Sequence, residues 1–332
     1  MKRFTPDYYP QFRCIAAACP DSCCKEWEVD VDATAAAFYR ALPGDLGDRL
    51  GQVLRDTEDG TCMTIENGRC PMWRQDGLCR IQAELGHDAL CQTCQQFPRL
   101  SHDYGDFVEL GLELSCPEAA RLILNSDQIY TEETLPGEET DDDEILSILL
   151  KSRKEVLDFL DSGRLPLNQA LAVVLIFAHE VQDALDGGEY LPLDADSALG
   201  VAMDNRGKAD LHAFVEFFRQ LEILTPQWKA RLDAPRSPAP WGHAFLALAK
   251  YGIWRYWLQA VSDLDLVCRV KFILSMCLMV NALGEDPVQT AQQFSKEIEN
   301  DADNVEAILD GAYRSPAFTD VNLLRLLLED RT

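Results

Sequence analysis

The sequence predicts a mainly α-helical protein built from an irregular, cysteine-rich, metal-binding N-terminal module and an all-α C-terminal helical domain. Ten of its 12 cysteines lie within the first 116 residues, whereas the chain beyond residue 144 repeats apolar residues at helical spacing. An acidic stretch separates the two parts. With 332 residues, of which 47% are hydrophobic, the chain is long enough for about two domains.

Residues 1–125 form the predicted metal-binding module, which is rich in Cys, Gly, Pro and short polar turns. Its predicted helices are short and cover residues 32–41, 45–55 and 89–96. Residues 107–114 alternate apolar and other side chains after the first position, which predicts one short strand. Such short elements bury little apolar surface, so we expect metal ligation to supply the missing stability.

Residues 126–143 form the predicted acidic linker. Pro136 precedes a run from residue 137 to residue 144 in which most side chains are Asp or Glu. Neighbouring like charges repel one another and stay solvated, which favours a linker. A cation-binding strip is the alternative interpretation.

Residues 144–332 form the predicted all-α domain. Two stretches place their apolar residues on one helical face each, namely Leu167, Leu171, Val174, Leu175, Ala178 and Val181, and Leu211, Phe214, Phe217, Phe218 and Leu221. A final amphipathic helix contains Val321, Leu324 and Leu328. Prolines fall near predicted helix starts, where proline is tolerated: Pro166, Pro226, Pro287 and Pro316.

The longest apolar stretch covers residues 264–283. It is apolar on nearly all sides and therefore predicts a central buried helix. Asp265, Arg269 and Lys271 make it too charged for a membrane span. No apolar segment follows Met1, so we expect no signal peptide, no membrane insertion and a cytoplasmic location.

The net charge of −26 argues against a nucleic-acid partner, because phosphate binding requires clustered Lys and Arg. The same charge is compatible with a cationic partner, such as a lysine-bearing protein surface. Solubility alone is the simpler explanation.

The cysteines indicate metal binding or redox chemistry, because a cytoplasmic chain rarely uses so many in disulfides. Four groups follow one another along the chain: Cys14-x4-Cys19-x3-Cys23-Cys24; Cys62, Cys70 and Cys79; Cys91-x2-Cys94; and Cys116-Pro117. Zinc sites usually show paired CxxC spacing, which appears here once. Dispersed thiolates also ligate iron–sulfur clusters, so the spacing leaves zinc and iron–sulfur equally open. A purely structural metal is a further possibility.

Two common enzyme signatures are absent from the sequence. No glycine-rich loop follows a predicted strand, so no dinucleotide-type binding site is evident. The Cys-x3-Cys-x2-Cys spacing of radical enzymes that cleave S-adenosylmethionine is not reproduced either.

The order of these motifs resembles the flagellin lysine-N-methylase family, which belongs with a wider group of cysteine-cluster proteins described as zinc- or iron-chelating. The resemblance covers roughly residues 8–124 and rests on five segments, Cys14-x4-Cys19-x3-Cys23-Cys24-Lys25-Glu26-Trp27, Gly68-Arg69-Cys70-Pro71-Met72-Trp73, Gly77-Leu78-Cys79-Arg80-Ile81, Leu90-x3-Cys94-x2-Phe97-Pro98-Arg99, and Leu114-Ser115-Cys116-Pro117-Glu118.

The resemblance implies an S-adenosylmethionine-dependent protein lysine N-methyltransferase that acts on flagellin and carries a [4Fe-4S] cluster, with zinc as the alternative metal. Four ligands for one cluster are expected among the eight cysteines that match the family pattern, Cys14, Cys19, Cys23, Cys24, Cys70, Cys79, Cys94 and Cys116. Cys62 and Cys91 match less clearly and form a second tier. A non-enzymatic iron–sulfur or zinc-binding redox or adaptor protein is the alternative function.

Lysine must lose a proton before it accepts a methyl group, because its pKa is about 10.4. We expect the catalytic group among Glu109, Glu113 and Tyr104, with His102 and Asp103 as alternatives. In a strand, Glu109 and Glu113 would share one face. The alternative interpretation is that this face is simply exposed to solvent.

Three further side chains are candidates for binding the methyl donor. Arg99 suits bidentate pairing with the donor carboxylate. Trp27 and Trp73 flank cysteines and would stack on adenine or a sulfonium, or shield the cluster. The alternative role of Arg99 is hydrogen bonding to loop carbonyls. The alternative role of both tryptophans is ordinary packing.

Overall fold

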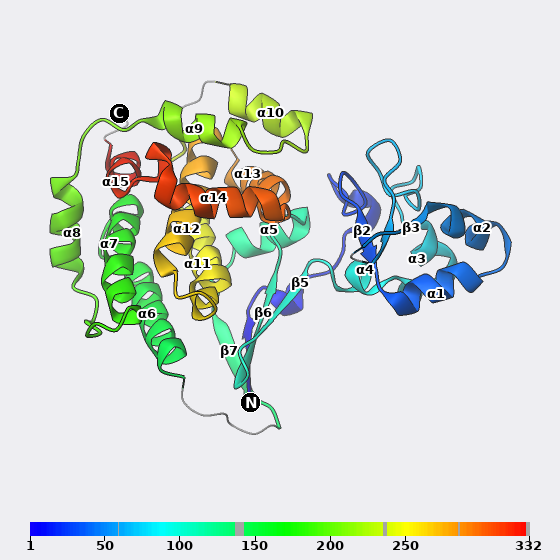
Figure 1. Cartoon of the computed structure of the whole chain (residues 1–332), viewed down its shortest axis with the longest axis horizontal. Helices are drawn as coiled ribbons and strands as arrows, with labels where there is room; N and C mark the ends of the chain where they lie inside the picture. Colours follow the sequence, from blue (N-terminus) through cyan, green and yellow to red (C-terminus); the bar gives the residue numbers. More distant parts are fainter. Residues whose placement is uncertain (59, 137–142, 235–237, 285, 330–332) are drawn as a thin grey trace.

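The computed structural model describes residues 1–58, 60–136, 143–234, 238–284 and 286–329, and within these the chain is mainly helical (Figure 1). Two β-sheets accompany the helices. A large helical body occupies one side of the molecule, and strands β2 to β4 with helices α1 to α4 lie on the other side. The expectation of a mainly α protein is confirmed, and the two sheets are an addition to it.

A four-stranded sheet links the first residues of the chain to the helical body. Its strands run in the order β5 (Arg99–Asp103), β6 (Phe107–Leu112), β1 (Lys2–Pro6) and β7 (Tyr130–Thr134). Strand β1 is parallel to β6 and antiparallel to β7, and β5 is antiparallel to β6. The predicted strand at residues 107–114 is therefore confirmed as β6.

The helical body contains one helix before strand β7 and ten after it among the described residues. They are α5 (Pro117–Leu124), α6 (Glu144–Asp161), α7 (Leu167–Leu185), α8 (Ala195–Asp204), α9 (Leu211–Arg219), α10 (Pro226–Asp233), α11 (His243–Tyr256), α12 (Leu266–Leu283), α13 (Pro287–Phe294), α14 (Ala302–Arg314) and α15 (Asp320–Leu328). A π-helical turn, η5 (Ser295–Glu299), directly follows α13. Because no strand occurs in the described part of residues 144–332, the all-α prediction holds there.

Aspartate side chains begin many of these helices. An aspartate at the N-cap accepts a hydrogen bond from a backbone N–H of the first turn in α1, α6, α8, α9, α12, α13 and α14, through Asp32, Asp143, Asp194, Asp210, Asp265, Asp286 and Asp301. Such a cap contributes about 0.5–2 kcal/mol to stability. Part of the acidic excess of the chain therefore has a local structural role.

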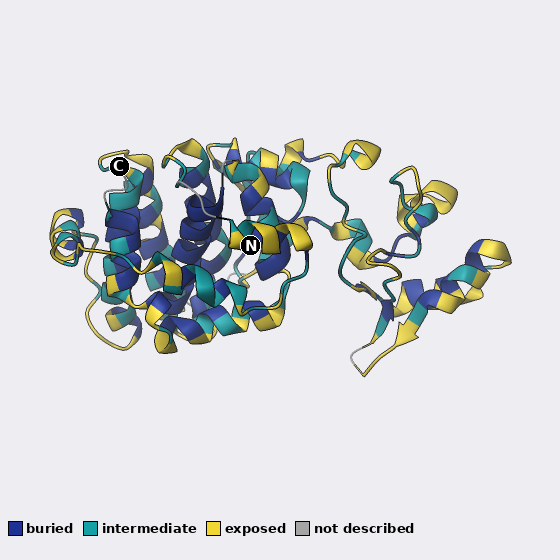
Figure 2. Cartoon of the chain, turned by 90° about the horizontal axis from the view of Figure 1, so that it is seen from above, coloured by how far each residue is buried: buried dark blue, intermediate teal, exposed yellow. Residues whose placement is uncertain are grey.

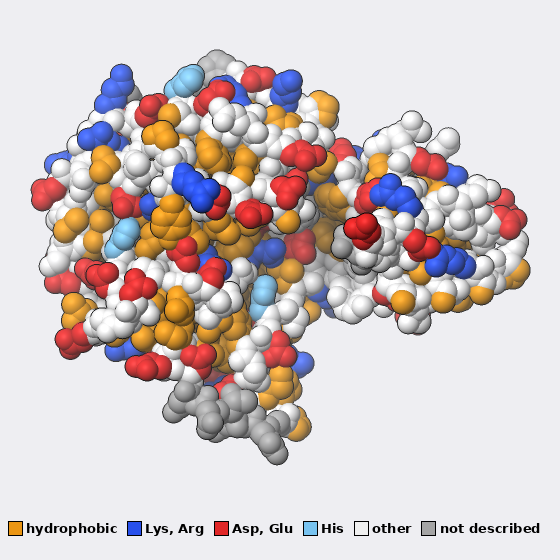
Figure 3. Space-filling model, viewed as in Figure 1, with side chains coloured by type: hydrophobic (Ala, Val, Ile, Leu, Met, Phe, Trp, Pro, Cys, Tyr) orange, Lys and Arg blue, Asp and Glu red, His pale blue; other side chains and the backbone are white. Residues whose placement is uncertain are grey.

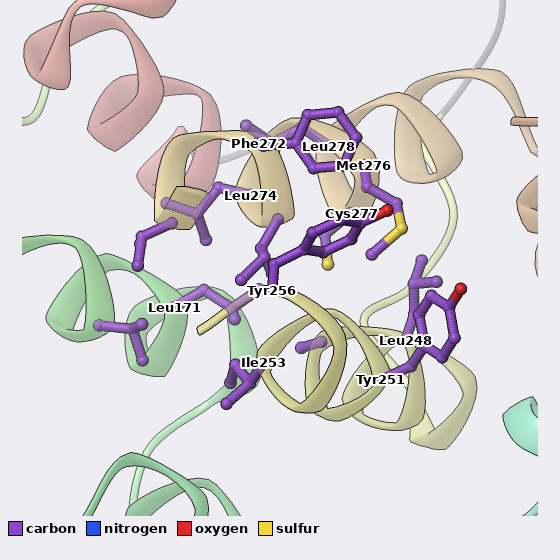
Figure 4. Close-up of a cluster of buried hydrophobic side chains, with 14 of the residues drawn as sticks. Leu171, Leu248, Tyr251, Ile253, Tyr256, Phe272, Leu274, Met276, Cys277 and Leu278 are labelled. Atoms are coloured by element: carbon purple, nitrogen blue, oxygen red, sulfur yellow. The ribbon is translucent and has the colours of Figure 1, made fainter. Parts of the chain in front are cut away.

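Helix α12 forms the centre of the large hydrophobic core. All of its residues are buried, and Figure 4 shows Phe272, Leu274 and Met276 on α12 facing side chains of α11 and α7. Gly252 lets α11 approach α12 closely, because a Cβ there would lie 2.8 Å from a methyl carbon of Ile273. By length and composition α12 is the one described helix that could cross a membrane, but it is wholly enclosed by protein.

A second hydrophobic core lies apart from the large one, and we call the part of the chain that builds it, residues 24–94, the small lobe. Its three-stranded sheet runs in the order β2 (Val29–Val31), β4 (Thr61–Met63) and β3 (Leu54–Asp56). Its helices are α1 (Ala33–Ala41), α2 (Gly44–Val53), α3 (Arg80–Leu85) and α4 (Gln92–Gln96). Figure 2 shows far fewer buried residues here than in the helical body.

The two hydrophobic cores do not divide the chain at residue 125, where the sequence predicted the end of the metal-binding module. Tyr8, Phe107 and Ile123 belong to the large core, so the first strand, β6 and α5 are parts of the helical body. Apolar side chains of α5 bury against α11 and α13, which explains why this segment leaves the small lobe. The predicted linker contains strand β7, and the greater part of its acidic run, residues 137–142, lies outside the described residues.

Candidate metal centre and the adjoining cleft

A tight turn in the small lobe brings two cysteines together. Asn67 and Gly68 both have positive φ, as a two-residue hairpin turn requires. The turn places the backbone N–H of Cys70 2.8 Å from the carbonyl oxygen of Cys24. The adjacent thiols of Cys23 and Cys24 influence each other's pKa, and that of Cys70 acts on Cys24, while the sulfur of Cys70 lies 3.2 Å from that of Met63.

Three more cysteines pack against the same core from other elements. Cys79 forms a β-bridge with Trp73 and immediately precedes α3. Cys91 is the N-cap of α4 and Cys94 lies within that helix, so each thiol influences the pKa of the other. Cys24, Cys70, Cys79, Cys91 and Cys94 all belong to or contact the small-lobe core.

Cys14, Cys19 and Cys116 lie elsewhere, where the small lobe meets the helical body. Gln292 of α13 donates to the carbonyl oxygen of Ser115 at 2.8 Å and to Asp21 at 3.3 Å. These contacts hold the segment around Cys116 next to the loop around Cys19. The thiol of Cys116 also interacts electrostatically with Cys19 and Cys14.

Cys62 occupies a different position within the small lobe. It lies on β4, where its thiol donates to Glu28 at 3.4 Å, and Arg55 is its cross-strand neighbour. Cys268 and Cys277 are buried in α12, far from the other groups in sequence. All 12 cysteines are free thiols.

Burial keeps most of these thiols protonated. It raises the pKa of Cys116 to about 12 and also raises those of Cys19 and Cys79. The neighbouring Cys94 lowers the pKa of Cys91 to about 7, whereas the pKa of Cys94 is raised by Cys91 and by burial. A metal that binds thiolates would have to displace these protons.

The donor chemistry of these residues fits a thiolate-ligated metal or cluster. At least eight free thiols gather in two small regions, mostly half-buried, as metal-binding cysteines of a reduced protein do. Within the described residues, no three His, Cys, Asp or Glu side chains are arranged to hold a single ion directly. The thiols interact chiefly in pairs, so metal loading would have to draw them further together.

A cleft of about 560 Å³ opens beside Cys19 and Cys23. The loop 20–26 forms one wall, and α13 with the π-helical turn η5 forms the other. Charged side chains of both signs line the cleft, namely the carboxylates Asp21, Glu26, Asp286 and Glu297 and the cations Lys25, Arg121 and Lys296. Figure 3 shows the narrowing between the helical body and the small lobe.

Lys296 of η5 crosses from the helical body to the cysteine loop. Its Nζ lies 2.8 Å from Asp21 and 2.6 Å from Glu26, and it lies 5.0 Å from the ring centroid of Trp27. Burial alone would raise the pKa of Asp21, but the Lys296 ammonium outweighs it and the pKa lies below its usual value. Glu26 has a φ of 75°, a strained value for a residue with a side chain. These contacts fix the loop that carries Cys19, Cys23 and Cys24.

Of the three candidates for donor binding, Trp27 lies next to the cleft, because Lys296 of the cleft wall contacts its ring. Its ring packs 6.3 Å from Phe97 and takes part in the Lys296 contact. One face of Trp73 is covered by Arg69, whose guanidinium lies 3.8 Å from the ring centroid. Arg99 is exposed at the start of β5 and lies over Phe12 at 5.1 Å.

The three candidate bases occupy different environments. Glu109 is buried in an ion pair with Arg153 of α6, with N–O distances of 2.9 and 2.5 Å. Tyr104 stacks on Phe107, and burial raises its pKa to about 12. Neither residue has a described contact with the cleft.

Glu113 lies closest to the cleft among these candidates. It accepts a hydrogen bond from Ser115 at 3.3 Å, and the carbonyl of Ser115 in turn contacts Gln292 of the cleft wall. Burial raises the pKa of Glu113, although Arg255 partly opposes this effect. The strand ends at Leu112, so Glu113 lies just beyond it.

Sequence reasoning missed Asp21, Gln292 and Lys296 as site residues. Lys296 and Gln292 lie in a stretch whose pattern is ordinary amphipathic helix, and nothing in it indicates a π-helical turn. Such turns frequently occur at functional sites. The position of Asp21 between Cys19 and Cys23 was the one available signal.

Comparisons with known proteins identify relatives of part of the chain. The flagellar biosynthetic protein FliU of Salmonella muenchen is 33% identical over 141 residues, a match that covers 38% of this chain and 80% of FliU. Lysine-N-methylases of Salmonella typhimurium and Salmonella choleraesuis are each 36% identical over 135 residues, again over 38% of this chain. The chain spans about a third of the length of each lysine-N-methylase, 34%. No protein-family model matches the chain, and no solved structure matches it significantly.

Proposed function

Because the chain belongs to the flagellin lysine-N-methylase family, we propose that it is a protein lysine N-methyltransferase that uses S-adenosylmethionine as methyl donor. Its substrate is a protein with surface lysines, and flagellin is the first candidate because relatives carry flagellar and lysine-methylase names. We place the reaction in the cytoplasm, where thiols remain reduced.

The observation that carries this proposal is the charged cleft beside the cysteine loop. Four carboxylates line it, Asp21, Glu26, Asp286 and Glu297, together with the cations Lys25, Arg121 and Lys296, of which Lys296 pairs with Asp21 and Glu26. Asp286 and Glu297 of the helical wall lie outside these two ion pairs and would attract the ammonium group of a substrate lysine, an attraction to which the net charge of −26 adds. A lysine side chain that enters here approaches the cysteines that the family resemblance identifies as cluster ligands.

Methyl transfer requires a neutral amine. The substrate Nζ must lose a proton, its lone pair then forms the new N–C bond, and the S–C bond of the sulfonium donor breaks with its electrons left on sulfur. We propose Glu113 as the proton acceptor, since burial raises its pKa and Ser115 connects it to the cleft wall. A carboxylate with a raised pKa accepts protons more effectively near neutral pH.

An iron–sulfur cluster bound by the cysteines would supply Lewis acidity beside the cleft. The residues that would hold it are drawn from Cys14, Cys19, Cys23, Cys24, Cys70, Cys79, Cys91, Cys94 and Cys116. Lys296 and Asp21 would keep the ligand loop in place against the helical body.

The test is methyl transfer by the anaerobically purified full chain. Flagellin and S-adenosylmethionine are added, and lysine methylation is followed by peptide mass spectrometry. We expect methylated lysines with the wild-type chain, a large loss of rate with Glu113→Gln, and an unchanged rate with Glu132→Gln, an exposed residue of β7. A wild-type rate for Glu113→Gln would exclude this base.

The alternative function predicts a different result in the same assay. A chain that binds iron but methylates no lysine-bearing protein would favour the non-enzymatic redox or adaptor interpretation. A zinc-containing chain without iron or sulfide would exclude the iron–sulfur cluster.

A further inference from the structure

Three side chains of the cysteine loop surround the ammonium group of Lys296. Asp21 and Glu26 supply carboxylate oxygens at 2.8 and 2.6 Å, and the ring centroid of Trp27 lies 5.0 Å away. Carboxylates and an aromatic face are the groups that stabilise a primary ammonium ion outside bulk water. The three residues therefore form a site for a lysine side chain, and we call them the ammonium subsite.

The ammonium subsite borders the cleft and is not sealed inside a core. Asp21, Glu26 and Lys296 all line the cleft of about 560 Å³. The side chain of Lys296 is only 3% exposed, whereas those of Asp21 and Glu26 are 23% and 25% exposed. A ligand in the cleft can therefore reach the two carboxylates while Lys296 is still bound to them.

The two carboxylates depend on Lys296 to different degrees. Asp21 also pairs with Lys25 at 3.3 Å and accepts from Gln292 at 3.3 Å. The Oε2 atom of Glu26 is buried, and among the described residues its one partner is Lys296. Departure of Lys296 alone would leave this oxygen without a counter-charge, which is costly for a buried group. A subsite that Lys296 has vacated therefore requires another cation.

Exchange of one ammonium group for another avoids this cost. The carboxylates keep a positive partner, and the released Lys296 regains the hydration that the incoming lysine loses, so the two desolvation costs nearly cancel. Lys296 lies on η5, and π-helical turns of this kind frequently occur at functional sites. The contacts that the rest of a substrate makes with the cleft then decide which lysine occupies the subsite.

We propose that Asp21, Glu26 and Trp27 bind the ammonium group of the substrate lysine, and that Lys296 occupies this subsite until a substrate lysine displaces it. The inference rests on the proposed function, which makes lysine the ligand of the cleft. It assigns Lys296 a competing role in addition to its role in holding the cysteine loop.

The first experiment measures binding of a lysine probe, Nα-acetyl-lysine methylamide, to the anaerobically purified full chain by titration calorimetry. The norleucine analogue, which has a side chain without an ammonium group, is the control ligand. Lys296→Ala empties the subsite. Lys25→Ala is the matched control, because it removes the same charge from the same cleft and leaves Lys296 in place.

We expect Lys296→Ala to bind the probe at least about tenfold more tightly than the wild-type chain, because the apparent Kd falls as the fraction of chains with an empty subsite rises. Lys25→Ala should gain much less, and the norleucine analogue should bind to none of the chains. Absence of probe binding in Lys296→Ala would overturn the proposal, and so would an equal gain in both variants.

A measurement on the wild-type chain covers the case in which Lys296→Ala does not fold. The chain is pulse-acetylated with and without saturating probe, with reagent in excess, and each lysine is followed by mass spectrometry. Lys296 should be protected without the probe and reactive with it. Lys250 and Lys271, each 6% exposed in the helical body, should stay protected in both cases. Protection of Lys296 at saturating probe would overturn the proposal.

Failure of this proposal and failure of the proposed function give different results. Neither measurement contains S-adenosylmethionine. A chain that exchanges Lys296 for the probe but methylates no protein would retain the ammonium subsite and lose the methyltransferase function. A chain that methylates flagellin while Lys296 stays protected would retain the function and lose the subsite.

Discussion

Replacement of Glu109 separates a structural role from a catalytic one. Glu109 is 3% exposed and Arg153 is 5% exposed, and two hydrogen bonds join them. The Arg153 guanidinium also lies 4.1 Å from the ring centroid of Trp254. In Glu109→Gln the guanidinium would stay buried without a counter-charge.

The size of the effect follows from that burial. Removal of one partner of a buried ion pair costs about 3–5 kcal/mol. At about 2 °C per kcal/mol for a chain of this size, the melting temperature should fall by roughly 6–10 °C. The double variant Glu109→Leu/Arg153→Met removes both charges and should recover most of the stability, since apolar replacement of a buried pair is often neutral.

The assay combines urea unfolding, followed by circular dichroism, with the methylation assay at a temperature where every variant is folded. Glu133→Gln is the control, because its pair with Arg3 is exposed and should change stability by less than about 0.5 kcal/mol. We expect Glu109→Gln to be destabilised but active. A variant with wild-type stability and no activity would refute the structural role and restore Glu109 as the base.

Three further predictions concern packing, acid stability and metal removal. Gly252→Ala should destabilise the chain by about 1–3 kcal/mol in urea unfolding, because the added methyl overlaps α12; an unchanged midpoint would contradict the close contact. Although burial opposes it, ion pairs with His179 and Lys271 lower the pKa of Asp320 to about 2, so its stabilising contribution is complete above pH about 4 and is lost as the pH falls toward 2. Asp320→Asn should flatten acid unfolding in that range, and an unaltered profile would argue against the interaction. Chelation of bound metal should make residues 14–26 sensitive to protease, and equal cleavage with and without metal would show that the metal does not order this loop.

The helical part could be predicted from the sequence because the apolar pattern of a helix is local. The apolar stretch around Leu274 has no polar face, and the charges at Asp265 and Arg269 argued against a membrane span, so the sequence favoured a buried core helix. The four-stranded sheet was not predictable in the same way. Its parallel pair joins Lys2 to Phe107, and no local pattern encodes a contact across that separation.

The site was predictable in its chemistry but not in its grouping. Cysteine number and spacing indicated metal binding, yet they did not divide Cys70 from Cys116, because that division depends on two separate cores. The alternation around Glu109 predicted a shared carboxylate face, but a buried arginine on α6 determines where that side chain lies. Lys296 carried no signal, because its role comes from a π-helical turn facing a distant loop.

Both the backbone and several side chains cross the boundary between the small lobe and the helical body. The chain enters the small lobe after Phe12, which belongs to the large core, and returns along β5 to Cys116. Lys296 and Gln292 reach across the same boundary to Asp21. The cleft is therefore bounded by both lobes, and the ion pairs of Lys296 with Asp21 and Glu26 hold its two walls together. Loss of these ion pairs should loosen the cleft and the cysteine loop at the same time.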